Sequence, residues 1–123
     1  MAEHNDTGKW GEELACAKLI REGYAIVERN WRMHNYEIDI IASRGPRIVF
    51  VEVKTRTDQL FDPLDAIDQK KIRHMVASAN VYIQNSGTRL EPQFDVMGIS
   101  GTPDNYKLEH IEDAFFPPLR TYN

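Results

Sequence analysis

The run of residues 48–53, Ile-Val-Phe-Val-Glu-Val, is the segment that most constrains how this chain can fold. Its apolar side chains are mostly β-branched or aromatic and occupy consecutive positions. A strand with one solvated face alternates apolar and polar residues, whereas a strand covered on both faces reads as a continuous apolar run. The sequence therefore predicts a central strand over residues 47–55, with other elements packed on both of its faces.

Capping and turn residues divide the rest of the chain into short elements. Asp6 or Thr7 can cap a first helix that ends near residue 22, where Gly23 suits the left-handed position after a helix. A second helix is expected to begin after Pro63 or Asp68 and to reach about residue 84. Strands are expected at four further places, namely residues 24–31, 36–42, 93–99 and 106–110. The order αβββαβ, with a last strand after it, predicts an α/β fold with a central mixed β-sheet flanked by helices.

Length and composition restrict the class of protein. A chain of 123 residues suits a single domain, and we expect residues 1–7 to form a flexible tail. No apolar run approaches the roughly 20 residues of a membrane helix, and the polar start of the chain lacks the apolar core of a secretory signal. Cys16 is the single cysteine, which fits a reducing compartment. We therefore expect a cytoplasmic protein that does not bind membranes.

The net charge of −4 argues mildly against a nucleic-acid partner. The charge is unevenly distributed, however, because residues 29–73 hold nine Lys or Arg against seven Asp or Glu. The excess of positive charge thus lies in the middle of the chain, which permits a nucleic-acid partner without requiring one.

Two segments carry charges that are unusual in strands. Glu37 and Asp39 alternate within one strand, and Glu52 and Lys54 alternate within the central strand, so each pair projects from one face. If the two strands are antiparallel neighbours, Asp39 and Glu52 converge and repel each other unless a proton or a cation lies between them. Mg²⁺ prefers such oxygen ligands, and Lys54 beside it can act on a water molecule or a phosphate. An ordinary ion pair at the rim of the sheet explains the same pattern, and spacing alone does not separate the two interpretations.

The spacing of Asp39 from the segment Glu52-Val53-Lys54 resembles the PD-(D/E)XK nuclease superfamily, although Ile38 stands where that motif has proline. The segment at residues 11–15, Gly-Glu-Glu-Leu-Ala, is similar to the first-helix motif of archaeal Holliday-junction resolvases in that superfamily. More closely, the chain resembles the YraN-like family of small bacterial proteins. The matching segments are residues 11–15, 29–32, 37–41, 49–56, 66–71 and 94–96.

The resemblance implies a restriction-endonuclease-like fold and a role for particular residues. Asp39 and Glu52 would bind Mg²⁺ or Mn²⁺ together with the backbone carbonyl of Val53. Lys54 would be the catalytic lysine, and Glu12 would reach the metal through water. Lys71 would contact a phosphate.

Two positions add to or depart from this pattern. Arg56 follows the lysine strand and can hold a phosphate, although a solvated strand end is an equal alternative. Tyr36 stands where the family usually has a glycine before the Glu-Ile-Asp segment, which leaves the shape of the preceding turn open.

Three functions are compatible with these residues. The first is a metal-dependent endonuclease that hydrolyses phosphodiester bonds in structured or branched nucleic acid, DNA in preference to RNA. The second is a non-catalytic nucleic-acid-binding or accessory protein on a nuclease scaffold. The third treats the acid–lysine pairs as structural and the chain as a homodimerising adaptor. A homodimer is also expected for the nuclease, by analogy with branched-DNA nucleases of the superfamily.

Overall fold

The computed structural model describes residues 2–58 and 62–116 of the chain. Within these residues it contains two α-helices, five strands and a short 3₁₀ helix. In chain order these are α1 (Ala2–Arg21), β1 (Ala25–Met33), β2 (Tyr36–Arg44), β3 (Arg47–Arg56), η1 (Pro63–Ala66), α2 (Gln69–Ser86), β4 (Glu91–Thr102) and β5 (Asn105–Ile111).

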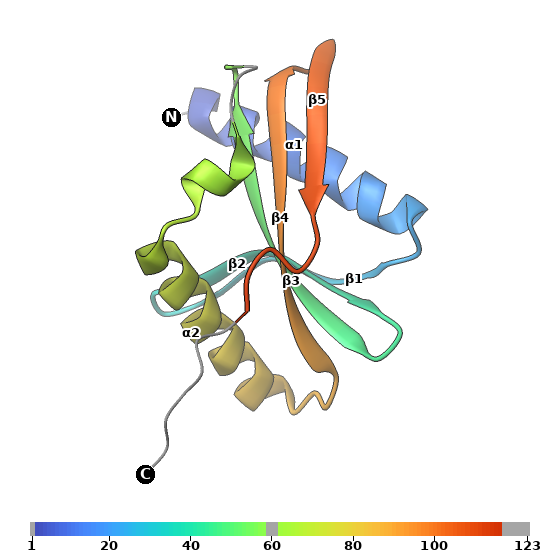
Figure 1. The fold of residues 1–123 in the computed structure, drawn as a ribbon, viewed down its shortest axis with the longest axis vertical. Helices are drawn as coiled ribbons and strands as arrows, with labels where there is room; N and C mark the ends of the chain where they lie inside the picture. Colours follow the sequence, from blue (N-terminus) through green and yellow to red (C-terminus); the bar gives the residue numbers. More distant parts are fainter. Residues whose placement is uncertain (1, 59–61, 117–123) are drawn as a thin grey trace.

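The five strands form one mixed sheet in the order β1-β2-β3-β4-β5 (Figure 1). β1, β2 and β3 form an antiparallel meander, and β5 is antiparallel to β4. β3 and β4 run parallel, because the connection between them passes through η1 and α2. The α/β class, the mixed sheet and the order of elements are therefore confirmed, and β3 occupies the centre of the sheet.

Each face of the sheet is covered by one helix, as Figure 1 shows. Val49 and Val51 of β3 belong to the core that includes Ala15 and Leu19 of α1. Phe50 alternates with them and belongs to the core formed with α2. Burial on both faces explains why this strand reads as a continuous apolar run, as predicted.

The helix boundaries differ from expectation at one end. α1 begins at Ala2, before the expected caps Asp6 and Thr7. Good capping residues mark where a helix can begin, but helix-forming residues such as Ala2 and Glu3 allow it to extend further back. The expected tail, residues 1–7, is thus helical from Ala2 onward, and its flexibility stays a prediction.

The start of α2 agrees with the sequence and positions a lysine. Asp68 is the N-cap, and its carboxylate accepts a hydrogen bond from the backbone N–H of Lys71 at 2.8 Å. The other proposed start, Pro63, begins η1 instead. Gly87 ends α2 in the left-handed conformation with φ 71°. The cap at Asp68 places Lys71 in the first turn of α2.

No helix in the described part of the chain is long and apolar enough to cross a membrane.

Candidate active site where β2 and β3 separate

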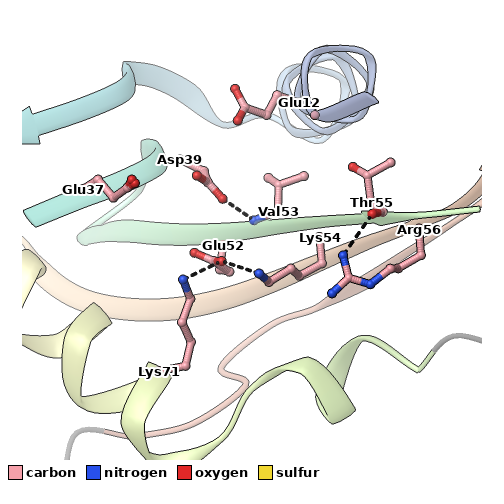
Figure 2. A pocket seen from close by; sticks show the side chains of 10 residues that line it. Glu12, Glu37, Asp39, Glu52, Val53, Lys54, Thr55, Arg56 and Lys71 are labelled. Carbon is pink, nitrogen blue, oxygen red and sulfur yellow. Dashed lines mark hydrogen bonds and ion pairs between the residues drawn. The ribbon is translucent and has the colours of Figure 1, made fainter. Parts of the chain in front are cut away.

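A pocket of about 580 Å³ lies between α1, β2, β3 and α2. Figure 2 shows its lining side chains, with Glu12 above β3 and Lys71 below it. The pocket is lined by Gly8, Glu12, Glu37, Asp39, Glu52, Val53, Lys54, Thr55, Arg56 and Lys71. The structure therefore brings together all seven residues for which the sequence predicts a metal, catalytic or nucleic-acid role. The roles themselves stay predictions.

The pocket forms because β2 leaves β3 at Asp39. The register of the two strands ends at the pair Ile40 and Val51. One residue further, the Asp39 carboxylate accepts a hydrogen bond from the backbone N–H of Val53, with 2.8 Å between Oδ2 and N (Figure 2). This carboxylate satisfies a backbone donor that the departing strand no longer pairs. The separation of the strands thus holds the Asp39 side chain against the segment that carries Glu52 and Lys54.

Glu52 is an ionisable residue on an otherwise apolar strand and is only 7% exposed. Its Oε2 atom lies 3.0 Å from Nζ of Lys71 and 3.6 Å from Nζ of Lys54. Glu52 alternates with Phe50 along β3 and so faces α2, where the first turn carries Lys71. A buried carboxylate is costly unless it is compensated, and here two ammonium groups compensate it.

Glu12 reaches the pocket because α1 lies unusually close to β3. A Cβ atom built on Gly11 would lie 2.1 Å from Oγ1 of Thr55, a distance that no real side chain tolerates. Only glycine allows this approach, and the next residue, Glu12, consequently lines the pocket. Partial burial raises the pKa of the Glu12 carboxyl, while a hydrogen bond from the Asn30 side chain and the charge of Arg29 oppose the rise.

The acids of the pocket destabilise one another's charged forms. Burial, the charge of Glu52 and the charge of Glu12 raise the pKa of Asp39 to about 7, against the lowering effects of the Val53 N–H and Lys71. Burial opposes the charge of Lys71, but the neighbouring carboxylates, Glu52 above all, outweigh it and raise the pKa of Lys71. The site therefore favours positive charge, either as bound protons or as a cation.

Comparison with known proteins places this architecture in a family. A model of the uncharacterised protein family UPF0102 matches residues 11–99, which is more than half of the chain. The chain belongs to the UPF0102 family. Membership of the YraN-like family, predicted from the sequence motifs, is thereby confirmed. A relationship to the PD-(D/E)XK nucleases stays a prediction.

Full-length relatives of this UPF0102 protein occur in several bacteria. A UPF0102 protein of Phocaeicola vulgatus is 43% identical over 120 residues, which cover 97% of this chain and 99% of the relative. One of Parabacteroides distasonis is 43% identical over 121 residues, covering 98% and 100%. One of Flavobacterium psychrophilum is 43% identical over 117 residues, covering 94% and 98%. The similarity thus extends over nearly the whole chain and includes every element that forms the pocket.

The donors of this UPF0102 site suit a hard cation. Among the residues that the structure describes, no three His, Cys, Asp or Glu side chains lie together as a ready metal site. Mg²⁺ does not need such a cage, because it keeps several waters and usually takes one or two carboxylates plus phosphate oxygens. Asp39 and Glu52 supply two carboxylates to the pocket lining, and the charge of Glu52 raises the pKa of Asp39. The residues present fit Mg²⁺ or Mn²⁺ better than a soft metal that requires Cys or His ligands.

One residue beside the site lies in the matching segment 29–32 but was assigned no role from the sequence. Asn30 has φ 53°, the left-handed conformation, in the middle of β1. Arg29 pairs with Ile40 and Trp31 with Ile38, so Asn30 lies opposite Asp39. Its side chain donates a hydrogen bond to Glu12 and so connects β1 to α1. An asparagine inside a strand pattern was the available signal, because Asn is depleted in strands and adopts the left-handed region more readily than most residues.

Proposed function

We propose that this UPF0102 protein is a metal-dependent endonuclease with a restriction-endonuclease-like fold. Its substrate would be structured or branched nucleic acid, DNA in preference to RNA. The observation that carries the proposal is the hydrogen bond from the Val53 N–H to Asp39, which holds this acid against the strand that carries Glu52 and Lys54. An ion pair between Glu52 and the lysines does not by itself require Asp39 and Glu12 to lie near the same carboxylate.

The residues of the pocket divide the work of phosphodiester hydrolysis. Asp39, Glu52 and the carbonyl of Val53 would hold Mg²⁺ or Mn²⁺, which when bound polarises a phosphate and lowers the pKa of water. The ammonium group of Lys54 would orient the attacking water or contact a phosphate oxygen. Glu12 would orient water from the side of α1. The water oxygen forms the new bond to phosphorus and loses its proton, the bond to the leaving oxygen breaks, and that oxygen takes up a proton.

Two basic residues of the pocket suit the phosphates beside the cleaved bond. Arg56 lies at the end of β3, and Lys71 lies in the first turn of α2. Both residues line the pocket. Lys71 lies on the opposite side of β3 from Glu12 (Figure 2). Arginine and lysine both bind phosphate oxygens, arginine with two parallel hydrogen bonds.

The second candidate is a non-catalytic nucleic-acid-binding protein, and one observation favours it. Lys71 and Lys54 already offset the charge of Glu52, so this carboxylate does not need a metal ion for compensation. Under this alternative the lysines would have a structural role, and nucleic acid would bind equally well with and without a divalent cation. The elevated pKa of Asp39, which no lysine offsets fully, argues against it.

A cleavage assay separates the candidates. Labelled duplex, single-stranded, flap and four-way-junction DNA, and matching RNA, are incubated with Mg²⁺, Mn²⁺ or EDTA. The wild type should cut at least one substrate only with metal, and Asp39→Asn and Lys54→Ala should each lower the rate by about 100-fold or more. Lys107→Ala, which removes an exposed lysine of β5 outside the pocket, is the matched control and should leave the rate unchanged. Binding without cutting in every condition would favour the second candidate.

A further inference from the structure

A second groove of about 410 Å³ joins the pocket across Asp39. The two share Gly8, Glu12, Glu37 and Asp39 in their linings. From there the second groove continues over Lys9 of α1 and residues 29–32 of β1, away from Lys54. Its size is in the range of ligand sites, about 300–1,000 Å³. The acids at Asp39 therefore lie where the two hollows meet, in the middle of a longer depression.

Charge changes sign along this depression. Its middle holds the shared acids Glu12, Glu37 and Asp39. Basic residues outnumber acids in both arms: Lys54, Arg56 and Lys71 lie with Glu52 on one side, and Lys9, Arg29 and Arg32 lie with Glu13 on the other. A polyanion that crosses an acidic centre with a bound cation meets positive charge on either side of it.

The β1 backbone presents both arginines to the groove. In a regular strand, residues three apart such as Arg29 and Arg32 point to opposite faces. The left-handed conformation of Asn30, with φ 53°, interrupts that alternation, and both arginines line the groove. Asparagine is one of the few residues other than glycine that adopts this conformation readily.

The present partners of the arginines are weak enough to exchange. Nη2 of Arg32 lies 3.7 Å from Oε1 of Glu37, and the Arg32 side chain is 77% exposed. Nη2 of Arg29 lies 3.3 Å from Oε2 of Glu13, whose side chain is 57% exposed. Exposed ion pairs contribute about 0–1 kcal/mol, so a phosphate can replace the carboxylate at little cost. Guanidinium groups bind phosphate oxygens in a bidentate manner.

We propose that this groove is a phosphate-binding channel for the same nucleic-acid strand, which the protein thus holds on both sides of Asp39. The inference deepens the proposed function and rests on it for the identity of the bound polyanion. A strand that must occupy both arms extends beyond the cleaved bond in both directions. The geometry consequently favours cutting within a strand over removing terminal nucleotides.

The test is a salt series of binding measurements, in which cleavage plays no part. Fluorescence anisotropy of a labelled single strand and a labelled four-way junction is measured with Ca²⁺ in place of Mg²⁺. Arg32→Ala should weaken binding several-fold. It should also make the fall of log affinity with log salt less steep by about 0.7, the value for one lost phosphate contact to a single strand. Arg89→Ala, at an exposed arginine outside both grooves, should change neither quantity. Thermal unfolding of both variants shows that they are folded.

The outcomes separate this inference from the proposed function. If Arg32→Ala binds like the wild type and Arg89→Ala in both affinity and slope, the channel is refuted even though the wild type cuts nucleic acid. If the wild type binds neither probe, the channel is also refuted. If Arg32→Ala shows the expected loss while the wild type never cuts, the channel stands and the nuclease activity does not.

Discussion

Asp39 is a mostly buried carboxyl group beside two other acids, Glu52 and Glu12. Burial is the largest cause that raises its pKa to about 7, from an ordinary value of 3.8. Because the folded pKa exceeds the unfolded one, the native state binds more protons between these two values. The contribution of Asp39 to the free energy of unfolding is therefore fully present below the unfolded pKa and is lost as pH rises through the folded pKa of about 7. In the absence of a cation, the ionised form of Asp39 works against folding at neutral pH.

Replacing Asp39 should consequently separate stability from function. Asp39→Asn keeps an oxygen that can accept the Val53 N–H hydrogen bond but removes the charge. In EDTA at pH 8 we expect the variant to be more stable than the wild type, by on the order of 1–3 kcal/mol, with a smaller difference at pH 5. Urea unfolding at both pH values measures the difference. A variant that is less stable at pH 8 would mean that the acid has a structural role, as the adaptor hypothesis requires.

Asn30 allows a similar separation of backbone strain from side-chain contact. Asn30→Ala should cost about 1–2 kcal/mol, because alanine is disfavoured at φ 53°. Asn30→Gly should cost less than Asn30→Ala, since glycine adopts this conformation freely. Both variants lose the hydrogen bond to Glu12 that lowers its pKa, so the acidic limb of the pH–rate profile should move to higher pH in each. An unchanged profile for Asn30→Gly would show that Asn30 serves the β1 backbone alone.

At the scale of elements, the site depends on how closely α1 approaches β3. Gly11 permits that approach over Thr55, and the helix then delivers Glu12 to the pocket. α2 supplies Lys71 from the opposite face of the sheet. The central strand β3 is therefore met by one pocket-lining side chain from each covering helix, and each comes from a helix end or a close crossing that packing determines.

The contact between α1 and β3 can be tested with a pair of glycines. Gly11→Ala should destabilise the protein by about 1–3 kcal/mol, because the new methyl group overlaps Thr55. Gly8→Ala is the control: a Cβ at this position meets nothing within 4 Å, and alanine is the better helix former. The cost of Gly11→Ala should shrink in a Thr55→Ala background, as chemical denaturation of the four proteins of the cycle would show. Equal costs in both backgrounds would place the strain elsewhere.

At the scale of the whole molecule, a divalent cation should stabilise the native state. The proposed ligands converge only in the folded protein, so cation binding adds RT ln(1 + [L]/Kd) to the free energy of unfolding. At about ten times Kd this is roughly 1.4 kcal/mol, or an increase of about 5 °C in Tm. Thermal unfolding with Mg²⁺ or with NaCl of equal ionic strength measures the effect. An increase in Tm that persists in Asp39→Asn would show that the cation binds elsewhere.

Local patterns in the chain were enough to predict most of the architecture. The continuous apolar run predicted β3 as a strand covered on both faces, and Asp68 and Gly23 predicted helix ends. Residues that alternate or repeat along one element carry this information, because a strand or helix has a fixed period. Asp39, Glu52 and Lys54 were found in this way, as charges that do not suit buried strands.

Contacts between distant segments depended on tertiary packing. The hydrogen bond from Val53 to Asp39, the approach of Gly11 to Thr55 and the left-handed Asn30 opposite Asp39 each join residues of different elements. No local period encodes them, because they arise where β2 leaves β3 and where a helix crosses the sheet. The chain's pattern of apolar and charged residues thus specified which groups are available for chemistry. The packing of α1, β1 and α2 around β3 decided how close together those groups lie and which of them carry charge.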